Sequence, residues 1–316
     1  MLHQHINEAV IILRGGGLIG LPTETVYGLA ADAENPEALH KIFLAKQRPS
    51  DHPLIVHIAD IEQLTHWTSS VSRVALKLAK AFWPGPMTLI LPKAEGVSDL
   101  ITGKQTTIGL RIPRHPVAQA VLKAFGRGVA APSANRYGHI SPTTALAVRE
   151  ELGDAVDMVL EGGQCDIGVE STIIDVSRGD PVILRPGMIS TADIEAVLHC
   201  PLSKKQDNAP RVSGSHALHY APTTPTQLIT QENFQQLEDV DFPCVLLTRK
   251  PFFPKNIHLD VVLMPDHPKL YAHDMYKTLR ELDKKGYKWI FIEAIPENLE
   301  WDAVRDRVGR ATAGVK

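Results

Sequence analysis

Polar side chains that could do chemistry are concentrated between residues 22 and 58. Residues 22–29 read PTETVYGL, a helical pattern ends at Lys46 and Arg48, and residues 51–58 read DHPLIVHI. Hydroxyls, a tyrosine, two cations and a histidine therefore stand at the ends of adjacent expected elements. A protein that handles a phosphate group and a small polar substrate needs this combination, so the segment is the first candidate for an active site.

Three further arginines close expected strands. Arg111 and Arg114 flank the end of TTIGLRIP, and Arg185 ends VILRP. Ligands of α/β sheets bind outside the carboxyl ends of strands, and a guanidinium forks onto phosphate or carboxylate, so these arginines predict an anion site. Lys46 and Arg48 allow two interpretations, because cations at a helix C-terminus either complement the helix dipole or clamp a polyphosphate.

Hydroxyl, amide and imidazole groups lie near the same strand ends. Ser133 and Asn135 belong to APSAN and Ser171 to GVEST; these side chains either donate to a phosphate or nucleoside or bond their own backbone in ordinary turns. No GxSxG motif surrounds Ser133, so a serine nucleophile is not supported. His57 in LIVHI is either a buried core histidine or a contact to a substrate carboxylate or hydroxyl.

The sequence lacks the motifs of several other ligand classes. No HxxxH or HExxH spacing occurs among the histidines, which argues against a metal held by the protein. No GxxxxGK[ST] or GxGxxG is present either, so ATP, if it binds, is expected to use side chains and strand ends. Cys165, Cys200 and Cys244 form no CxxC pair and are expected to be free thiols in a reducing cytosol.

Length and composition favour a two-core cytoplasmic protein. The chain has 316 residues, 44% of them hydrophobic, and a net charge of −3. A single core stops growing near ~250–300 residues, so two domains are expected. The acidic balance argues against a broad nucleic-acid-coating surface. No segment approaches the ~20 apolar residues that span a bilayer, and the N-terminus does not read as a signal peptide, so no membrane partner is expected.

Periodicity predicts an α/β first domain that positions these groups. Several expected strand pairs lack an intervening helix, so the sheet should be mixed rather than a clean βαβ repeat. Expected helices cover residues 6–13, 36–46, 70–82, 117–124, 143–152 and 191–198. Expected strands cover residues 18–21, 54–58, 87–91, 107–112, 128–131, 158–160, 172–176 and 182–184.

A polar stretch separates this domain from a second one. Residues 201–222 contain several prolines and no period, which is typical of a linker. We therefore expect domains at 1–200 and 223–316. In the second domain, strands are expected at 244–247, 261–264 and 289–292, and helices at 268–285 and 301–313.

Together these motifs resemble the threonylcarbamoyl-AMP synthase family. The resemblance rests on PTETVYGL, the KxR of Lys46 and Arg48, PLIVHI, GPMTLIL, GLRIPRHP, APSAN followed by SPT, and GVESTIID with ILRPG, all in family order. The linker's SGSHALHYAP and the second domain are similar to the two-domain branch. The resemblance implies a twisted mixed-sheet YrdC-like domain, a linker, and a small Rossmann-like α/β domain.

The resemblance also implies a reaction. The amine of L-threonine captures bicarbonate or CO2 as a carbamate, a carbamate oxygen attacks the α-phosphate of ATP, and pyrophosphate leaves. The ATP phosphates would carry Mg²⁺ without a carboxylate cage. Threonylcarbamoyl-AMP would then pass to a separate tRNA-modifying complex. Direct contact with RNA is possible but not required.

Matching motif positions imply roles for individual residues. Lys46 and Arg48 are the expected catalytic pair. The expected threonine-holding set is Thr25, His57, Arg111 and Ser171, with Arg111 on the amino-acid carboxylate. The expected nucleotide set is Lys46, Arg48, His52, Thr107, Ser133, Asn135, Ser141 and Arg185, and Ser213 and Tyr220 of the linker would close the site against water.

The chain departs from the family pattern at two positions. His52 stands where relatives often have Asn, and Ala131 where they often have Thr. A contact at residue 131 would therefore have to come from the backbone.

Two alternatives to the synthase stay open at this stage. One is an RNA-binding module without turnover. The other is a different carbamoyl-transferring enzyme, although the acylphosphatase and zinc-finger cysteines expected of it are missing. The second domain is interpreted as a support for the lid without a site of its own.

Overall fold

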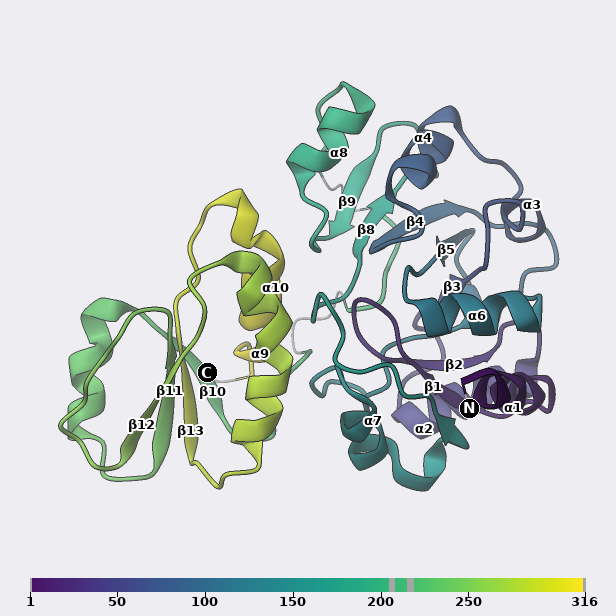
Figure 1. Ribbon diagram of the computed structural model, residues 1–316. Helices are drawn as coiled ribbons and strands as arrows, with labels where there is room; N and C mark the ends of the chain where they lie inside the picture. Colours follow the sequence, from purple (N-terminus) through teal and green to yellow (C-terminus); the bar gives the residue numbers. More distant parts are fainter. Residues whose placement is uncertain (1, 205–207, 215–218, 315–316) are drawn as a thin grey trace. The chain divides into compact units, whose positions relative to one another are not determined.

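The structure, a computed structural model, describes residues 2–204, 208–214 and 219–314. It divides into two compact units (Figure 1). One comprises Met1–Tyr137 and Pro142–Ser215, and the other Gly138–Ser141 and His216–Lys316. Each has an α/β fold with its own sheet, so the predicted fold class is confirmed. The boundaries expected at residues 200 and 222 stay a prediction.

The first unit is built on a nine-stranded mixed sheet with the order β7-β1-β2-β6-β3-β5-β4-β8-β9. Strands β3 and β5 are parallel, while β4 runs antiparallel to β5 and parallel to β8. The strands are β1 (Ile19–Leu21), β2 (Gly28–Asp32), β3 (Ile55–His57), β4 (Met87–Pro92), β5 (Thr107–Arg111), β6 (Val129–Ala130), β7 (Met158–Val159), β8 (Thr172–Asp175) and β9 (Val182–Arg185).

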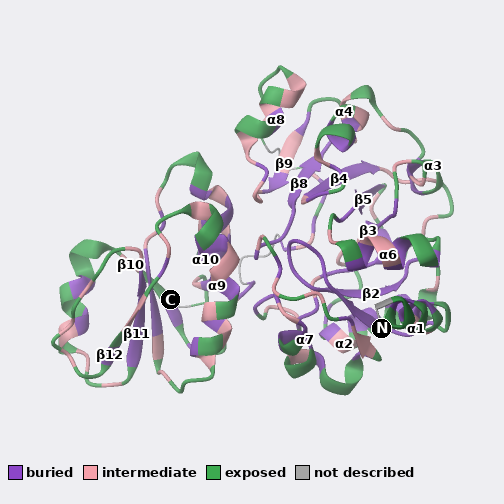
Figure 2. Ribbon diagram, viewed as in Figure 1, coloured by how far each residue is buried: buried purple, intermediate pink, exposed green. Residues whose placement is uncertain are grey.

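Helices cover both faces of this sheet. The helical elements are α1 (Leu2–Arg14), α2 (Pro36–Lys46), α3 (Leu64–Trp67), α4 (Arg73–Phe82), α5 (Asp99–Thr102), α6 (Pro116–Phe125), α7 (Ala145–Leu152), the 3-10 turn η1 (Gly153–Ala155) and α8 (Thr191–Leu198). Helices α1 and α6 share one apolar cluster, which includes Leu13 and Val121. A second cluster joins Leu39 of α2 and Leu78 of α4 to Leu110 of β5. Figure 2 shows the buried strands between helices with exposed outer faces.

The sequence prediction missed β2, a central strand. Its sequence GLAAD contains no β-branched or aromatic residue, and small residues have low strand propensity. Leu29 and Ala31 belong to one apolar cluster and Ala30 to the other, so the strand is buried on both faces. No alternation of apolar and polar residues marks such a strand in the sequence.

The second unit contains a four-stranded sheet in which every pairing is parallel, with the order β10-β13-β11-β12. Its elements are β10 (Thr226–Ile229), η2 (Gln231–Asp239), β11 (Cys244–Thr248), β12 (Leu259–Leu263), α9 (Pro268–Asp283), β13 (Trp289–Glu293), η3 (Leu299–Trp301) and α10 (Asp302–Ala311). The prediction missed β10 and η2. Strand β10 lies at the sheet edge with Gln227 and Leu228 exposed, and η2 is mostly polar, so neither shows a clear apolar pattern.

Within the described ranges, no helix is long and apolar enough to cross a membrane.

We expect Leu110→Ala to lower the free energy of unfolding by about 2–5 kcal/mol, because Leu110 is fully buried in β5 and its removal leaves a cavity. The matched variant Leu44→Ala removes a side chain that is 77% exposed, so the free energy of unfolding should change by less than about 0.5 kcal/mol. Urea denaturation of the intact chain, followed by circular dichroism, measures both. Equal losses in the two variants would contradict this placement of the core.

Candidate functional site

The candidate site begins where the parallel strands β3 and β5 end together. His57 and Arg111 are the last residues of these strands and are partners in the register. Side chains of register partners project to the same side of a sheet. Both side chains are buried, so the imidazole and the guanidinium lie next to each other at the carboxyl edge where α/β sheets bind ligands.

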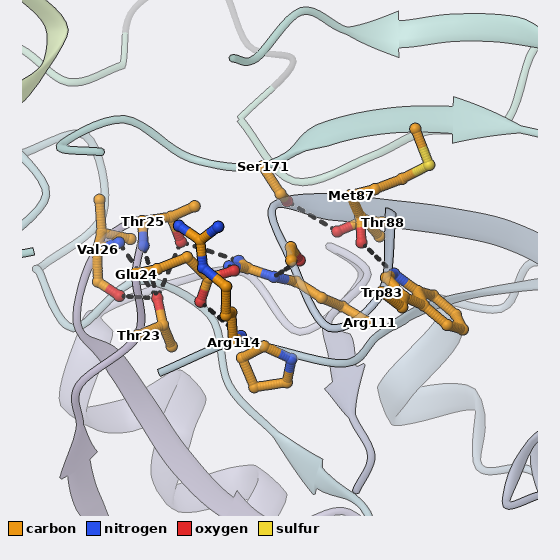
Figure 3. A network of polar contacts seen from close by, with 12 residues as sticks. Thr23, Glu24, Thr25, Val26, Trp83, Met87, Thr88, Arg111, Arg114 and Ser171 are labelled. Atoms are coloured by element: carbon orange, nitrogen blue, oxygen red, sulfur yellow. Dashed lines mark hydrogen bonds and ion pairs between the residues drawn. The ribbon is translucent and has the colours of Figure 1, made fainter. Parts of the chain in front are cut away.

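Arg111 is held by three acceptors from two loops (Figure 3). Its Nε donates to the carbonyl of Gly85 at 3.2 Å and its Nη1 to Thr25 Oγ1 at 2.9 Å. Its Nη2 donates to Glu24 Oε1 at 2.7 Å, which forms a buried ion pair. The guanidinium therefore has a defined orientation before any ligand arrives.

The two threonines of PTET form a directed hydrogen-bond chain. The hydroxyl of Thr23 donates to the carbonyl of Val26 at 2.6 Å. The hydroxyls of Thr23 and Thr25 lie 2.9 Å apart, and a hydroxyl has only one hydrogen, so Thr25 must be the donor in that contact. Thr25 Oγ1 can then only accept, as it does from Arg111.

Glu24 is a site residue that the sequence analysis missed. Its carboxylate is 1% exposed, and its second oxygen accepts from the backbone N–H of Arg114 at 3.0 Å. Burial alone would raise the pKa of Glu24. The Arg111 charge and the hydrogen bonds from Arg111 and the Arg114 backbone outweigh burial, so the pKa lies below its usual value and the group is ionised.

His57 is a neutral imidazole in this setting. Burial, with a further contribution from the Arg111 charge, lowers its pKa to about 3. Its Nδ1 is buried and has no hydrogen-bond partner among the residues that the structure describes. Because buried polar atoms are nearly always paired, this nitrogen is a candidate contact for a ligand.

Ser171 belongs to the predicted threonine-holding set and is bonded to Arg185 of the predicted nucleotide set. Its hydroxyl lies 2.7 Å from the hydroxyl of Thr88 on β4 (Figure 3). Arg185 Nη2 donates to the Ser171 hydroxyl at 3.1 Å and to its carbonyl at 2.9 Å. Thr88 was also missed by the sequence analysis. Its position in the buried run MTLILP predicts a strand residue but gives no sign of its polar partner.

Helix α2 delivers Lys46 to the APSAN turn. The helix starts after Asn35, whose side chain accepts from two backbone N–H groups, and ends at Lys46, followed by a left-handed cap at Gln47. Lys46 Nζ donates to the carbonyls of Ser133 and Asn135, each at 2.5 Å. Burial, together with the charge of Arg48, lowers the pKa of Lys46 well below its usual value.

Arg48 and Arg185 meet at Ser213. Arg48 Nη2 donates to Ser213 Oγ at 3.2 Å and to the carbonyl of Pro53 at 2.9 Å, and Arg185 Nη1 donates to the Ser213 carbonyl at 3.0 Å. Ser213 Oγ donates to the same Pro53 carbonyl at 2.8 Å. This part of the predicted linker is thus bound to two arginines of the predicted nucleotide set.

The remaining predicted residues have different surroundings. Thr107 is buried at the start of β5, and the half-buried His52 ring lies 5.4 Å from the Tyr137 ring. Ser141 and Tyr220 are buried and belong to the second unit, where Arg307 of α10 lies 5.2 Å from the centre of the Tyr220 ring. Their expected contacts with a nucleotide stay predictions.

The residues within the described ranges contain no group of three or more His, Cys, Asp or Glu side chains that could hold a metal ion.

Family models cover nearly the whole chain. Residues 11–187 match the Sua5/YciO/YrdC family model, described as "Telomere recombination". Residues 189–313 match the model of the "Threonylcarbamoyl-AMP synthase, C-terminal domain". The first match defines the class of the mixed-sheet domain, and the second distinguishes the two-domain members.

Individual relatives are similar over the same length. The threonylcarbamoyl-AMP synthase of Pyrococcus abyssi is 35% identical over 97% of this chain and 94% of its own, and that of Bacillus subtilis is 35% identical over 98% and 93%. The crystal structure of P. abyssi Sua5 complexed with L-threonine matches with a TM-score of 0.89 at 34% identity, covering 97% of this chain and 94% of that one. The chain therefore belongs to the threonylcarbamoyl-AMP synthase family and is an enzyme of the nucleotidyltransferase type.

These findings confirm the predicted family and do not favour the RNA-binding module. Full-length HypF, solved in a phosphate- and nucleotide-bound form, matches at 20% identity with a TM-score of 0.52 over 57% of this chain and 28% of that one. A likeness at that level shows a shared fold alone.

His57 should make the protein less stable as the pH falls below about 6.5. Its pKa is lower in the folded state, about 3, than in the unfolded chain, so unfolding takes up a proton between these values. The stabilising effect is complete above about pH 6.5 and is lost toward pH 3, by up to ~1.4 kcal/mol per pH unit.

In His57→Asn the free energy of unfolding should fall less steeply as the pH is lowered from about 6.5 to 3. The difference corresponds to at most one proton fewer taken up on unfolding. Urea denaturation at several pH values measures it, and NMR titration of the His57 ring gives its pKa directly. A variant with the parent's slope, or a ring that titrates near pH 6.5, would contradict the neutral buried imidazole.

Proposed function

We propose that the chain makes threonylcarbamoyl-AMP and pyrophosphate from L-threonine, ATP, and bicarbonate or CO2. The observation that carries the proposal is the pre-oriented buried guanidinium of Arg111 beside the neutral ring of His57, with Thr25 bonded to the same guanidinium. These side chains suit an amino-acid ligand, because a guanidinium pairs with its carboxylate. The relative from P. abyssi was solved with L-threonine.

Arg111 would bind the carboxylate of threonine. It is buried and charged, and a guanidinium pairs with a carboxylate through two parallel hydrogen bonds. The neutral His57 suits the threonine side-chain hydroxyl, because a neutral imidazole has one donor and one acceptor nitrogen and a hydroxyl can pair with either. The hydroxyl of Ser171 supplies a further polar group.

Arg48 and Arg185 would bind the phosphates of ATP. Both are buried, and both already contact Ser213, so an incoming nucleotide would meet two cations at one place. Lys46 would hold the APSAN turn in place through its two carbonyl bonds and so orient the Ser133 and Asn135 side chains toward the nucleotide. Mg²⁺ would come with the ATP, because this ion is commonly held by substrate phosphates and water.

The chemistry would follow in two steps. The threonine nitrogen forms a bond to the carbon of CO2, or of bicarbonate with loss of hydroxide as water, and gives a carbamate after losing a proton. A carbamate oxygen then bonds to the α-phosphorus while the bond to the bridging oxygen of pyrophosphate breaks. The protein contributes mainly position and charge, as in other phosphate-transfer reactions.

Closure against water would protect the carbamate from decomposing. Ser213 lies against both arginines, which supports a role for its segment in covering the nucleotide. Tyr220 is expected to complete this cover. We place the reaction in the cytoplasm, where the product would pass to a separate complex that modifies an adenosine of tRNA.

The direct test incubates the purified chain with ATP, Mg²⁺, bicarbonate and L-threonine and follows pyrophosphate release. Release that depends on threonine and bicarbonate is expected. Release without threonine would mean another acceptor. No release, combined with tight salt-sensitive tRNA binding, would instead support the RNA-binding module.

Arg48→Ala should lower kcat/KM for ATP by about 10–100-fold, because charge-assisted hydrogen bonds to phosphate are worth roughly 1.5–3 kcal/mol. The matched variant Arg127→Ala removes an arginine that is 59% exposed and bonded to Asp32 and Glu34, and should stay within about 3-fold of the parent. Steady-state pyrophosphate release measures both. Equal effects would contradict a phosphate role for Arg48.

Arg111→Lys should raise the KM for threonine by about 10-fold or more and leave the KM for ATP within a few-fold of the parent. Lysine keeps the charge, and with it the pairing to Glu24, but cannot form the bidentate fork to a carboxylate. A KM change for ATP with none for threonine would move Arg111 to the nucleotide set.

A further inference from the structure

We propose that Glu24 is a positioning residue that prepares Arg111 for the substrate carboxylate and so gives the site its preference for an amino-acid carboxylate. The inference rests on the proposed function, because it takes threonine to be the ligand of Arg111. Glu24 acts through Arg111, to which it is bonded at 2.7 Å.

The way in which the N–H donors of the Arg111 guanidinium are shared between acceptors points to this role. An arginine side chain has five N–H bonds. The protein uses three of them, one each on Nε, Nη1 and Nη2, with Gly85, Thr25 and Glu24 as acceptors. The structure records no other hydrogen bond from this side chain to the described residues. One N–H on each terminal nitrogen is left, so Arg111 keeps two donors for the oxygens of a carboxylate.

Glu24 holds more than the guanidinium. Its second oxygen accepts from the backbone N–H of Arg114, three residues after Arg111. One buried carboxylate therefore fixes both the head of the Arg111 side chain and the loop that follows its strand. Figure 3 shows Glu24 between these two partners, with the Thr25 contact on the same guanidinium.

The charge of Glu24 has a second effect, which would weaken the binding of threonine. A carboxylate beside Arg111 repels a second carboxylate, so removing the Glu24 charge would tighten threonine binding if repulsion dominated. Loss of orientation would weaken it. The contact of 2.7 Å and the burial of both side chains favour orientation, because a guanidinium without its partner would turn toward other acceptors.

The test compares L-threonine with L-threonine amide, which lacks the carboxylate charge. Isothermal calorimetry without ATP gives the dissociation constant of each for the parent and for Glu24→Gln, which keeps the shape and one acceptor oxygen. We expect the parent to prefer threonine. In Glu24→Gln, threonine binding should weaken by about 10-fold or more, while amide binding changes by less than about 3-fold. The preference ratio, which is the dissociation constant of the amide divided by that of threonine, therefore falls.

A merely structural role would give a different result, because a damaged pocket would lose both ligands equally. The matched control is Asp175→Asn, another buried carboxylate of the first unit, which accepts from the N–H and hydroxyl of Ser177. It should leave the preference ratio unchanged. If Glu24→Gln does not fold, Glu24→Asp keeps the charge but withdraws it by one methylene, and the ratio should fall there too.

The outcomes separate this inference from the proposed function. A parent protein that binds neither ligand, or shows no preference for threonine, would overturn the assignment of the pocket itself. A parent that prefers threonine, with Glu24→Gln or Glu24→Asp keeping the ratio or binding threonine more tightly, would overturn the role of Glu24 and leave the pocket intact.

Discussion

The burial of the Arg111 charge is the constraint on which the rest of the site depends. A guanidinium inside a protein costs several kcal/mol in lost hydration unless acceptors and an opposite charge replace the water. Glu24, Thr25 and the Gly85 carbonyl do so, and they come from two different loops. The PTET loop and the loop before β4 must therefore both be in place for Arg111 to stay charged and buried.

The mixed sheet explains how these loops reach one point. Parallel pairing of β3 with β5 ends both strands at the same edge and places His57 beside Arg111. Parallel pairing of β4 with β8 brings Thr88 and Ser171 to the same region by a separate route. The sheet thus supplies two pairs of strand ends. Arg185, bonded to Ser171, connects the second pair to the groups expected to bind the nucleotide.

Much of this arrangement could be predicted from the sequence, because strand ends that carry arginine before proline are visible in it. The two strands that escaped prediction lack a periodic signal: β2 is buried on both faces with small residues, and β10 is a short edge strand. Thr25, His57, Arg111 and Ser171 could be named from motif positions. Their partners could not be named, because these contacts join residues far apart in the sequence. Arg111 is 86 residues from Thr25 and 87 residues from Glu24.

Lys46 shows why a residue type and a motif do not by themselves define a role. The sequence allowed a helix-dipole cation or a phosphate clamp, and both assume an ammonium group that faces solvent or ligand. The structure adds a third role, because Lys46 is 1% exposed and its Nζ joins two carbonyls of the APSAN turn. Burial disfavours its charged form, as the lowered pKa shows. Bonded in this way, Lys46 stabilises the turn, and under the proposed function the attraction of the ATP phosphates would fall mainly to Arg48 and Arg185.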